Sequence, residues 1–135
     1  MLAVTRYPKE YVDECRARMK AQASAYRRLA ASADEAAVES FTPFFFANLT
    51  VALDASFVHR TRAIEGKDGN ALNEVRMLCA SILTNDGILT ADRTIKYKPE
   101  ASVLKLQLGD EIRLDEKRFR RLSDAFFAEL ERKFT

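Results

Sequence analysis

Apolar residues recur at steps of three and four along the first part of the chain, a spacing that places them on one face of a helix. The residues that follow this spacing are Val12, Cys15, Met19, Ala23, Tyr26 and Ala30. Pro8 precedes them, and proline suits the first position of a helix. The pattern therefore predicts one amphipathic helix over residues 8–31.

The segment Ser32-Ala-Asp-Glu35 predicts the start of a second helix. In this S-x-x-E form, the serine and glutamate side chains each accept a hydrogen bond from a backbone amide near the helix start. Farther along, Thr42-Pro43 indicates either another helix start or a kink.

The next stretch, residues 41–58, is apolar around almost the whole circumference of a helix: F-T-P-F-F-F-A-N-L-T-V-A-L-D-A-S-F-V. Such a helix must be covered on several sides. Its polar residues interrupt the run before it reaches the roughly 18 apolar residues of a membrane span. We therefore interpret it as the central helix of a bundle and expect no membrane partner. A chain of 135 residues has few other elements to cover this surface, so we expect a homodimer that buries part of it.

Glycines and polar residues at positions 66–70 predict a loop between this helix and another one. Asn70 is a good N-cap for the second of these helices, and Asn85-Asp-Gly87 predicts where that helix ends. The apolar positions between them are Leu72, Val75, Leu78, Cys79, Ile82 and Leu83. We expect the two helices to form an antiparallel hairpin, in which the glycines supply the left-handed backbone of the turn.

The last third of the chain predicts short strands followed by a helix. Residues 94–98 alternate between polar and apolar, as do residues 104–108, although residues 99–104 could equally form one helical turn. Asp115 predicts the N-cap of a final helix. Its apolar face comprises Phe119, Leu122, Phe126, Leu130 and Phe134. The chain thus predicts a mainly α fold: a bundle of four to five helices with a short antiparallel β-ribbon before the C-terminal helix, in a single domain over residues 1–135.

Composition narrows the class of partner. Charged residues make up 31% and hydrophobic ones 47%, which is typical of a soluble globular protein. The 22 basic and 20 acidic residues give a net charge of +2, too balanced to favour nucleic acid as a partner. The first residues lack the apolar core of a targeting segment, so we expect a cytoplasmic protein. Cys15 and Cys79 lack the spacing and histidine companions of a zinc or redox site. We interpret them as buried helical thiols and expect no metal and no cofactor.

Polar residues are concentrated between Phe57 and Leu78, which hold the only histidine, three arginines, two glutamates and two asparagines. The first interpretation of this stretch is structural. In an antiparallel hairpin, Arg62 would pair with Glu74, and Glu65 would pair with Arg76. Exposed pairs of this kind contribute about 0.2–1 kcal/mol each, so they would fix the register of the hairpin more than its stability.

The second interpretation is an anion site. Residues 67–70 lead into a helix whose free amides and dipole favour negative charge. Charge-assisted hydrogen bonds from arginine and lysine would complete a pocket for a phosphate or carboxylate, and Glu74 would orient Arg62. The candidate ligand-binding residues are Arg60, Arg62, Lys67, Asn70, Asn73, Glu74 and Arg76.

The third interpretation is catalysis. Histidine is the residue type most often used as a general base, and His59 would act in this way if a nearby carboxylate held its tautomer, with an arginine stabilising a developing oxyanion. A metal site of the kind found in helical bundles needs E-x-x-H pairs, and the sequence has none.

Three blocks of the sequence resemble a family of small bacterial proteins without an assigned activity: F-V-H-R-T-R-A-I-E-G-K-D-G-N-A-L-N-E-V-R, T-I-K-Y-K-P-E-A-S-V-L and A-F-F-A-E-L-E. The resemblance covers about residues 41–134 and implies a cytoplasmic single-domain protein, with no reaction or ligand to transfer. Together with the residues, it favours a non-catalytic, self-associating protein that binds a partner or a small anionic ligand. A small enzyme that uses His59 as a base is the alternative.

Overall fold

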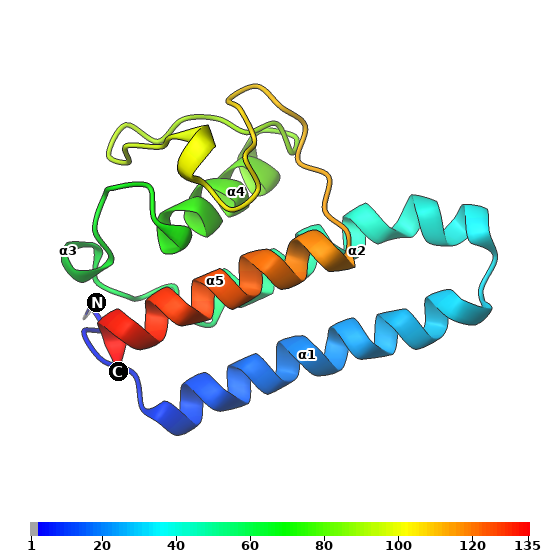
Figure 1. Cartoon of the computed structure of the whole chain (residues 1–135), viewed down its shortest axis with the longest axis horizontal. Coiled ribbons are helices and arrows are strands. Elements are labelled where there is room, and N and C mark those ends of the chain that lie inside the picture. Colours follow the sequence, from blue (N-terminus) through cyan, green and yellow to red (C-terminus); the bar gives the residue numbers. More distant parts are fainter. Residues whose placement is uncertain (1–2) are drawn as a thin grey trace.

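A computed structural model describes residues 3–135, and this part of the chain is mainly helical (Figure 1). The elements are α1 (Lys9–Ser32), α2 (Glu35–Ala55), α3 (Arg62–Glu65), α4 (Ala71–Thr84), the 3-10 turn η1 (Pro99–Ala101) and α5 (Glu116–Phe134). The predicted mainly helical fold is confirmed.

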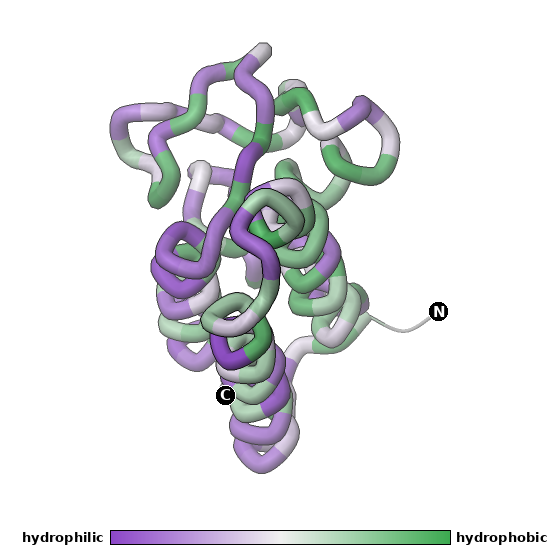
Figure 2. Tube along the Cα trace, turned by 90° about the vertical axis from the view of Figure 1, so that its right-hand side faces the viewer, coloured by the Kyte–Doolittle hydropathy of each residue, from purple (hydrophilic) through white to green (hydrophobic). Residues whose placement is uncertain are grey.

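Helix α5 joins the other helices together. It contacts α1, α2, α3 and α4, while α2 contacts α1 and α4. In Figure 1, α1 lies below α5, and α4 with the irregular segment 85–115 lies above it. Figure 2 views the molecule from the end toward which α1 and α2 project, and it shows the same segment above the helices.

The core forms where the apolar faces of these helices meet. All five apolar residues predicted for the last helix are buried. The rings of Phe46 on α2 and Phe119 on α5 lie 5.6 Å apart between centroids, so the two helices pack together at this level. Cys15 and Cys79 are free and buried, as predicted. Burial raises the pKa of the Cys79 thiol well above its ordinary value.

The helix starts follow capping chemistry, with one correction to the prediction. Asn70 and Asp115 cap α4 and α5 as expected. The predicted cap Ser32 is instead the last residue of α1, and Asp34 caps α2 by accepting a hydrogen bond from the amide of Ala37. A carboxylate is at least as good a cap as a hydroxyl. Pro43 lies inside α2 and starts no new helix.

The predicted β-ribbon is not confirmed. Within residues 3–135, the only pairing in this region is an isolated antiparallel bridge between Ile88 and Glu111. Pro99 opens the 3-10 turn, and Lys105 adopts a left-handed backbone with φ 57°. Both interrupt the extended backbone that a ladder requires.

The hairpin between α2 and α4 is also less regular than predicted. Helix α2 ends at Ala55, and residues 56–61 and α3 separate it from the loop before α4. The N-terminal segment holds this irregular part in place, since the amide of Val4 donates to the carbonyl of His59 (2.7 Å) and the amide of Thr61 donates to the carbonyl of Val4 (2.8 Å).

Helix α2 is long and apolar enough to cross a membrane by length and composition, a test that the core helix of a soluble protein also passes. Only 22% of its most apolar window is buried in the chain. Much of an apolar helix is therefore left uncovered within the single chain.

Candidate functional site

The polar stretch singled out in the sequence folds into a compact group of charged side chains. We call it the Glu65 cluster: Asp54, Arg60, Glu65, Asn73 and Arg76. Its members come from the end of α2, the irregular segment after it, α3 and the first turns of α4. The chain therefore brings together Arg60, Asn73 and Arg76 from the predicted ligand-binding set.

Glu65 is the centre of the cluster, and its side chain is completely buried. One carboxylate oxygen accepts from Arg60 Nε (2.9 Å) and from the Arg76 guanidinium (2.6 Å). The other accepts from Asn73 Nδ2 (2.7 Å) and Arg76 Nε (3.1 Å). Each oxygen thus has two donors. Burial alone would raise the pKa of Glu65, but the hydrogen bonds and charges of its partners outweigh burial and hold that pKa below its usual range.

Arg60 is buried as completely as its partner Glu65. Its guanidinium also donates to the carbonyls of Phe57 (3.0 Å) and Leu72 (3.2 Å) and stacks over the ring of Phe126 on α5. Asp54 lies 2.9 Å away, although the oxygen concerned lacks the alignment of a hydrogen bond. Arg60 therefore connects α2, α3, α4 and α5, and its donors face protein groups.

The start of α4 is occupied by protein groups as well. The side-chain oxygen of Asn70 accepts from the amides of Leu72 (2.9 Å) and Asn73 (3.1 Å), and its Nδ2 donates to the carbonyl of Glu65 (2.8 Å). Lys133 near the end of α5 donates to that same carbonyl (2.8 Å). The amides expected to hold an anion are thus used in capping.

One predicted ion pair forms and the other does not. Glu65 pairs with Arg76, as expected. The predicted pair of Arg62 and Glu74 is wrong: Arg62 donates to the hydroxyl of Thr94 (2.8 Å), and Glu74 accepts from backbone amides of residues 103 and 104. The reason is the short helix α3, which places Glu65 toward the interior and Arg62 toward the loop at 94.

Glu74 fixes the long segment after α4 to the helix. The buried carboxylate accepts from the amides of Val103 (2.8 Å) and Leu104 (3.0 Å). Burial raises the pKa of Glu74, and the two amide hydrogen bonds offset part of that effect. This role for Glu74 could not be predicted, because nothing in residues 103–104 marks their amides as its partners.

Two remaining candidates lie on the surface. His59 and Lys67 are exposed. Among residues 3–135, no side-chain hydrogen bond or ion pair involves the imidazole of His59, so no carboxylate orients it as a base. In the same described part of the chain, no group of three or more potential metal ligands occurs.

Three surface hollows lie elsewhere, and none is lined by the Glu65 cluster. The first is between α1 and α5, and the second is between α2 and the loops around residues 88 and 112. The third covers the turn between α1 and α2 and is lined almost entirely by apolar side chains, including Tyr26, Leu29 and Phe41. Nothing in the sequence distinguishes this turn, because its apolar residues fit a buried helix face equally well.

The turn belongs to a projecting part of the molecule, residues 28–44, which we call the hairpin tip (Figure 1). Arg27 of α1 pairs with Glu116, the first residue of α5. The hairpin tip therefore extends beyond the N-terminal end of α5. Its large apolar side chains are among the most exposed of the chain: Leu29 at 61%, Phe41 at 48% and Phe44 at 68%.

No protein-family model, curated protein or solved structure matches this chain. The resemblance to a family of small bacterial proteins therefore rests on the quoted residues alone.

Proposed function

We propose that this protein is a non-catalytic interaction protein that self-associates, and that the hairpin tip docks against a second copy of the same chain. The observation that carries the proposal is the exposure of Leu29, Phe41 and Phe44 in the hairpin tip, the part of α1 and α2 that projects beyond the start of α5. Apolar side chains clustered on a projecting surface favour association, because burial removes them from water.

The hairpin tip carries charges of both signs, so a second copy can pair with them. Arg28 lies on the α1 side, whereas Asp34, Glu35 and Glu39 lie at the turn and on the α2 side, and all four are exposed. In a two-fold arrangement, each patch meets its counterpart on the other copy. Such an axis can place α1 of one copy against α2 of the other, so that basic and acidic residues face each other around an apolar centre.

The Glu65 cluster supports a non-catalytic interaction protein over an anion-binding one, because its charged side chains are paired with one another. The buried Arg60 donates to Glu65 and to two backbone carbonyls, and the partly buried Arg76 donates to Glu65, so a phosphate or carboxylate would have to displace internal partners. An anion at this position would compete with a buried, fully hydrogen-bonded carboxylate. The cluster is accordingly best described as the clasp that holds α2, α3, α4 and α5 together.

Sedimentation analysis across a concentration series tests the proposal. The tip is small, and small interfaces are weak, so we expect dimerisation between roughly 1 and 500 µM. Phe44→Glu should leave the fold intact, because Phe44 is exposed, and should shift the protein to monomer. Leu108→Glu is the matched control, since Leu108 is also exposed (52%) but lies in the segment before α5.

Three results would contradict the proposal. The first is a wild-type protein that stays monomeric over the whole series, and the second is a dimer that both substitutions weaken equally. The third is binding of the monomer to lipid vesicles through α2, lost in Phe44→Glu, which would make a membrane surface the occupant.

A further inference from the structure

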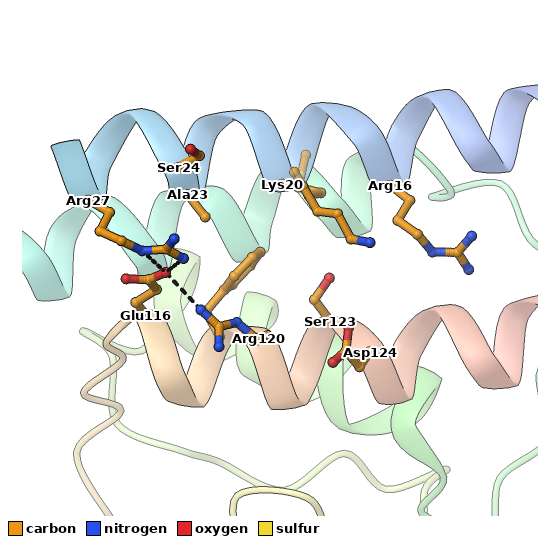
Figure 3. Close-up of a pocket in the computed structure, with 11 residues that line it drawn as sticks. Arg16, Lys20, Ala23, Ser24, Arg27, Glu116, Arg120, Ser123 and Asp124 are labelled. Atoms are coloured by element: carbon orange, nitrogen blue, oxygen red, sulfur yellow. Dashed lines mark hydrogen bonds and ion pairs between the residues drawn. The ribbon is translucent and has the colours of Figure 1, made fainter.

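A groove of about 430 Å³ lies between α1 and α5 and shares no residue with the hairpin tip or the Glu65 cluster (Figure 3). Its size falls within the roughly 300–1,000 Å³ of small-molecule sites. Met19 and Phe119 are buried beneath it, and Ala23 adds a small apolar surface from α1. The groove thus offers an apolar floor with room above it.

The walls of this groove carry an excess of positive charge. Four basic and two acidic side chains line it. Glu116 is shared by two guanidinium groups, because it accepts from Arg27 Nε (2.8 Å) and from Arg120 (3.0 Å). The ammonium of Lys20 extends into the space between the helices (Figure 3), and it forms no ion pair with any residue of 3–135.

Ser123 adds a polar group that has no protein partner. Its side chain is 8% exposed, and its hydroxyl points from α5 across the groove toward α1 (Figure 3). Serine in a helix commonly donates to the carbonyl one turn back. Ser123 makes no hydrogen bond of this kind, or of any other kind, within the described residues. The hydroxyl is open to the groove and is therefore a donor available to a ligand there.

We propose that the groove binds a small amphipathic anion. Lys20, Arg120 and the hydroxyl of Ser123 hold its carboxylate or phosphate head, and its short hydrocarbon body lies over Met19 and Phe119. Charge-assisted hydrogen bonds fix the head group, and burial of apolar surface holds the body. This inference is independent of self-association, because the groove lies outside the hairpin tip.

Nuclear magnetic resonance titration of the ¹⁵N-labelled protein tests this site with three probes that share one octyl chain: nonanoate, octyl phosphate and octanol. We expect at least one of the two anions to shift the amide signals of residues 19–24 and 119–124 and to saturate, and neutral octanol to bind about tenfold more weakly or not at all. The anion that binds more tightly identifies the head group. Equal affinity for octanol, or shifts concentrated in residues 28–44, would overturn the proposal, because either result would mean unspecific binding to apolar surface.

Two variants, a double substitution of the basic residues and a substitution that fills the groove, test where the anion binds. Lys20→Gln with Arg120→Gln should weaken binding of the preferred anion about tenfold or more, whereas Lys117→Gln, an exposed change on the same helix outside the groove, should not. Ala23→Phe should block binding by filling the groove while leaving all its charges in place. Circular dichroism checks that each variant is folded. Unchanged anion affinity in both folded variants would refute the assignment.

Discussion

At the scale of single residues, the molecule depends on one buried carboxylate. Glu65 is the acceptor for Arg60, which precedes α3, and for Asn73 and Arg76 on α4. Removing one partner of a buried ion pair leaves the other charge without compensation. Glu65 should therefore be the most sensitive polar position in the chain.

Glu65→Gln tests this dependence. The amide keeps the shape of the side chain but removes the charge that compensates Arg60, so we expect the free energy of unfolding to fall by about 3–5 kcal/mol. Urea denaturation at pH 7 measures it. Glu100→Gln is the matched control at an exposed glutamate and should change stability by less than about 0.5 kcal/mol. Equal effects of the two substitutions would show that the Glu65 cluster contributes no special stability.

The pH dependence of stability follows from the same residue. The pKa of Glu65 is depressed in the folded state. Its contribution to the free energy of unfolding is therefore fully present above the pKa that a glutamate has in the unfolded chain, about 4.3. That contribution is lost as the pH falls through the lower folded-state pKa. The difference in unfolding free energy between the wild type and Glu65→Gln should therefore shrink below about pH 4.3. A difference that stays constant between pH 7 and pH 3 would contradict the depressed pKa.

At the scale of elements, the loop before α4 is shaped by a close backbone approach. Gly69 has φ +88°, and a Cβ added there would lie 2.6 Å from the carbonyl oxygen of Lys96. The loop is held to the same segment by the amide of Lys96, which donates to the carbonyl of Lys67 (2.8 Å). The position thus requires glycine for two reasons, backbone conformation and space.

Gly69→Ala and Gly109→Ala separate these two reasons. Gly109 has φ +94°, and an added Cβ there meets nothing within 4 Å, so alanine incurs only the conformational cost, about 1–3 kcal/mol. Gly69→Ala incurs a similar cost and must also displace the Lys96 backbone, which should add about 1–3 kcal/mol. Thermal and urea denaturation compare the two variants. A Gly69→Ala protein as stable as Gly109→Ala would mean that the segment at Lys96 moves freely.

The helices could be predicted from the sequence because their evidence is local. The spacing of apolar residues in α1 and α5, and the caps Asn70 and Asp115, depend on neighbours within a turn or two. The partners of Arg62 and Glu74 could not be predicted, since they depend on how α3 turns and where residues 94 and 103–104 pass. Alternation alone likewise indicated a ribbon that a left-handed Lys105 interrupts.

At the scale of the whole molecule, the fold has a closely packed part and a projecting part. The Glu65 cluster and the apolar face of α5 fix α2, α3, α4 and α5 to one another. The hairpin tip extends past the first residue of α5 and exposes aromatic and aliphatic side chains. Few contacts hold such a segment, so its helices should open locally more often than α4 or α5.

Hydrogen exchange at two protein concentrations, one below and one above the dimerisation midpoint, tests the docking of the hairpin tip most directly. If the proposed dimer forms, binding of the second copy stabilises the folded hairpin tip by mass action, and amides of residues 28–44 should exchange more slowly at the higher concentration. Amides of α4 and the C-terminal half of α5 should be unchanged. Exchange in residues 28–44 that is independent of concentration, or protection that develops only elsewhere, would contradict the account.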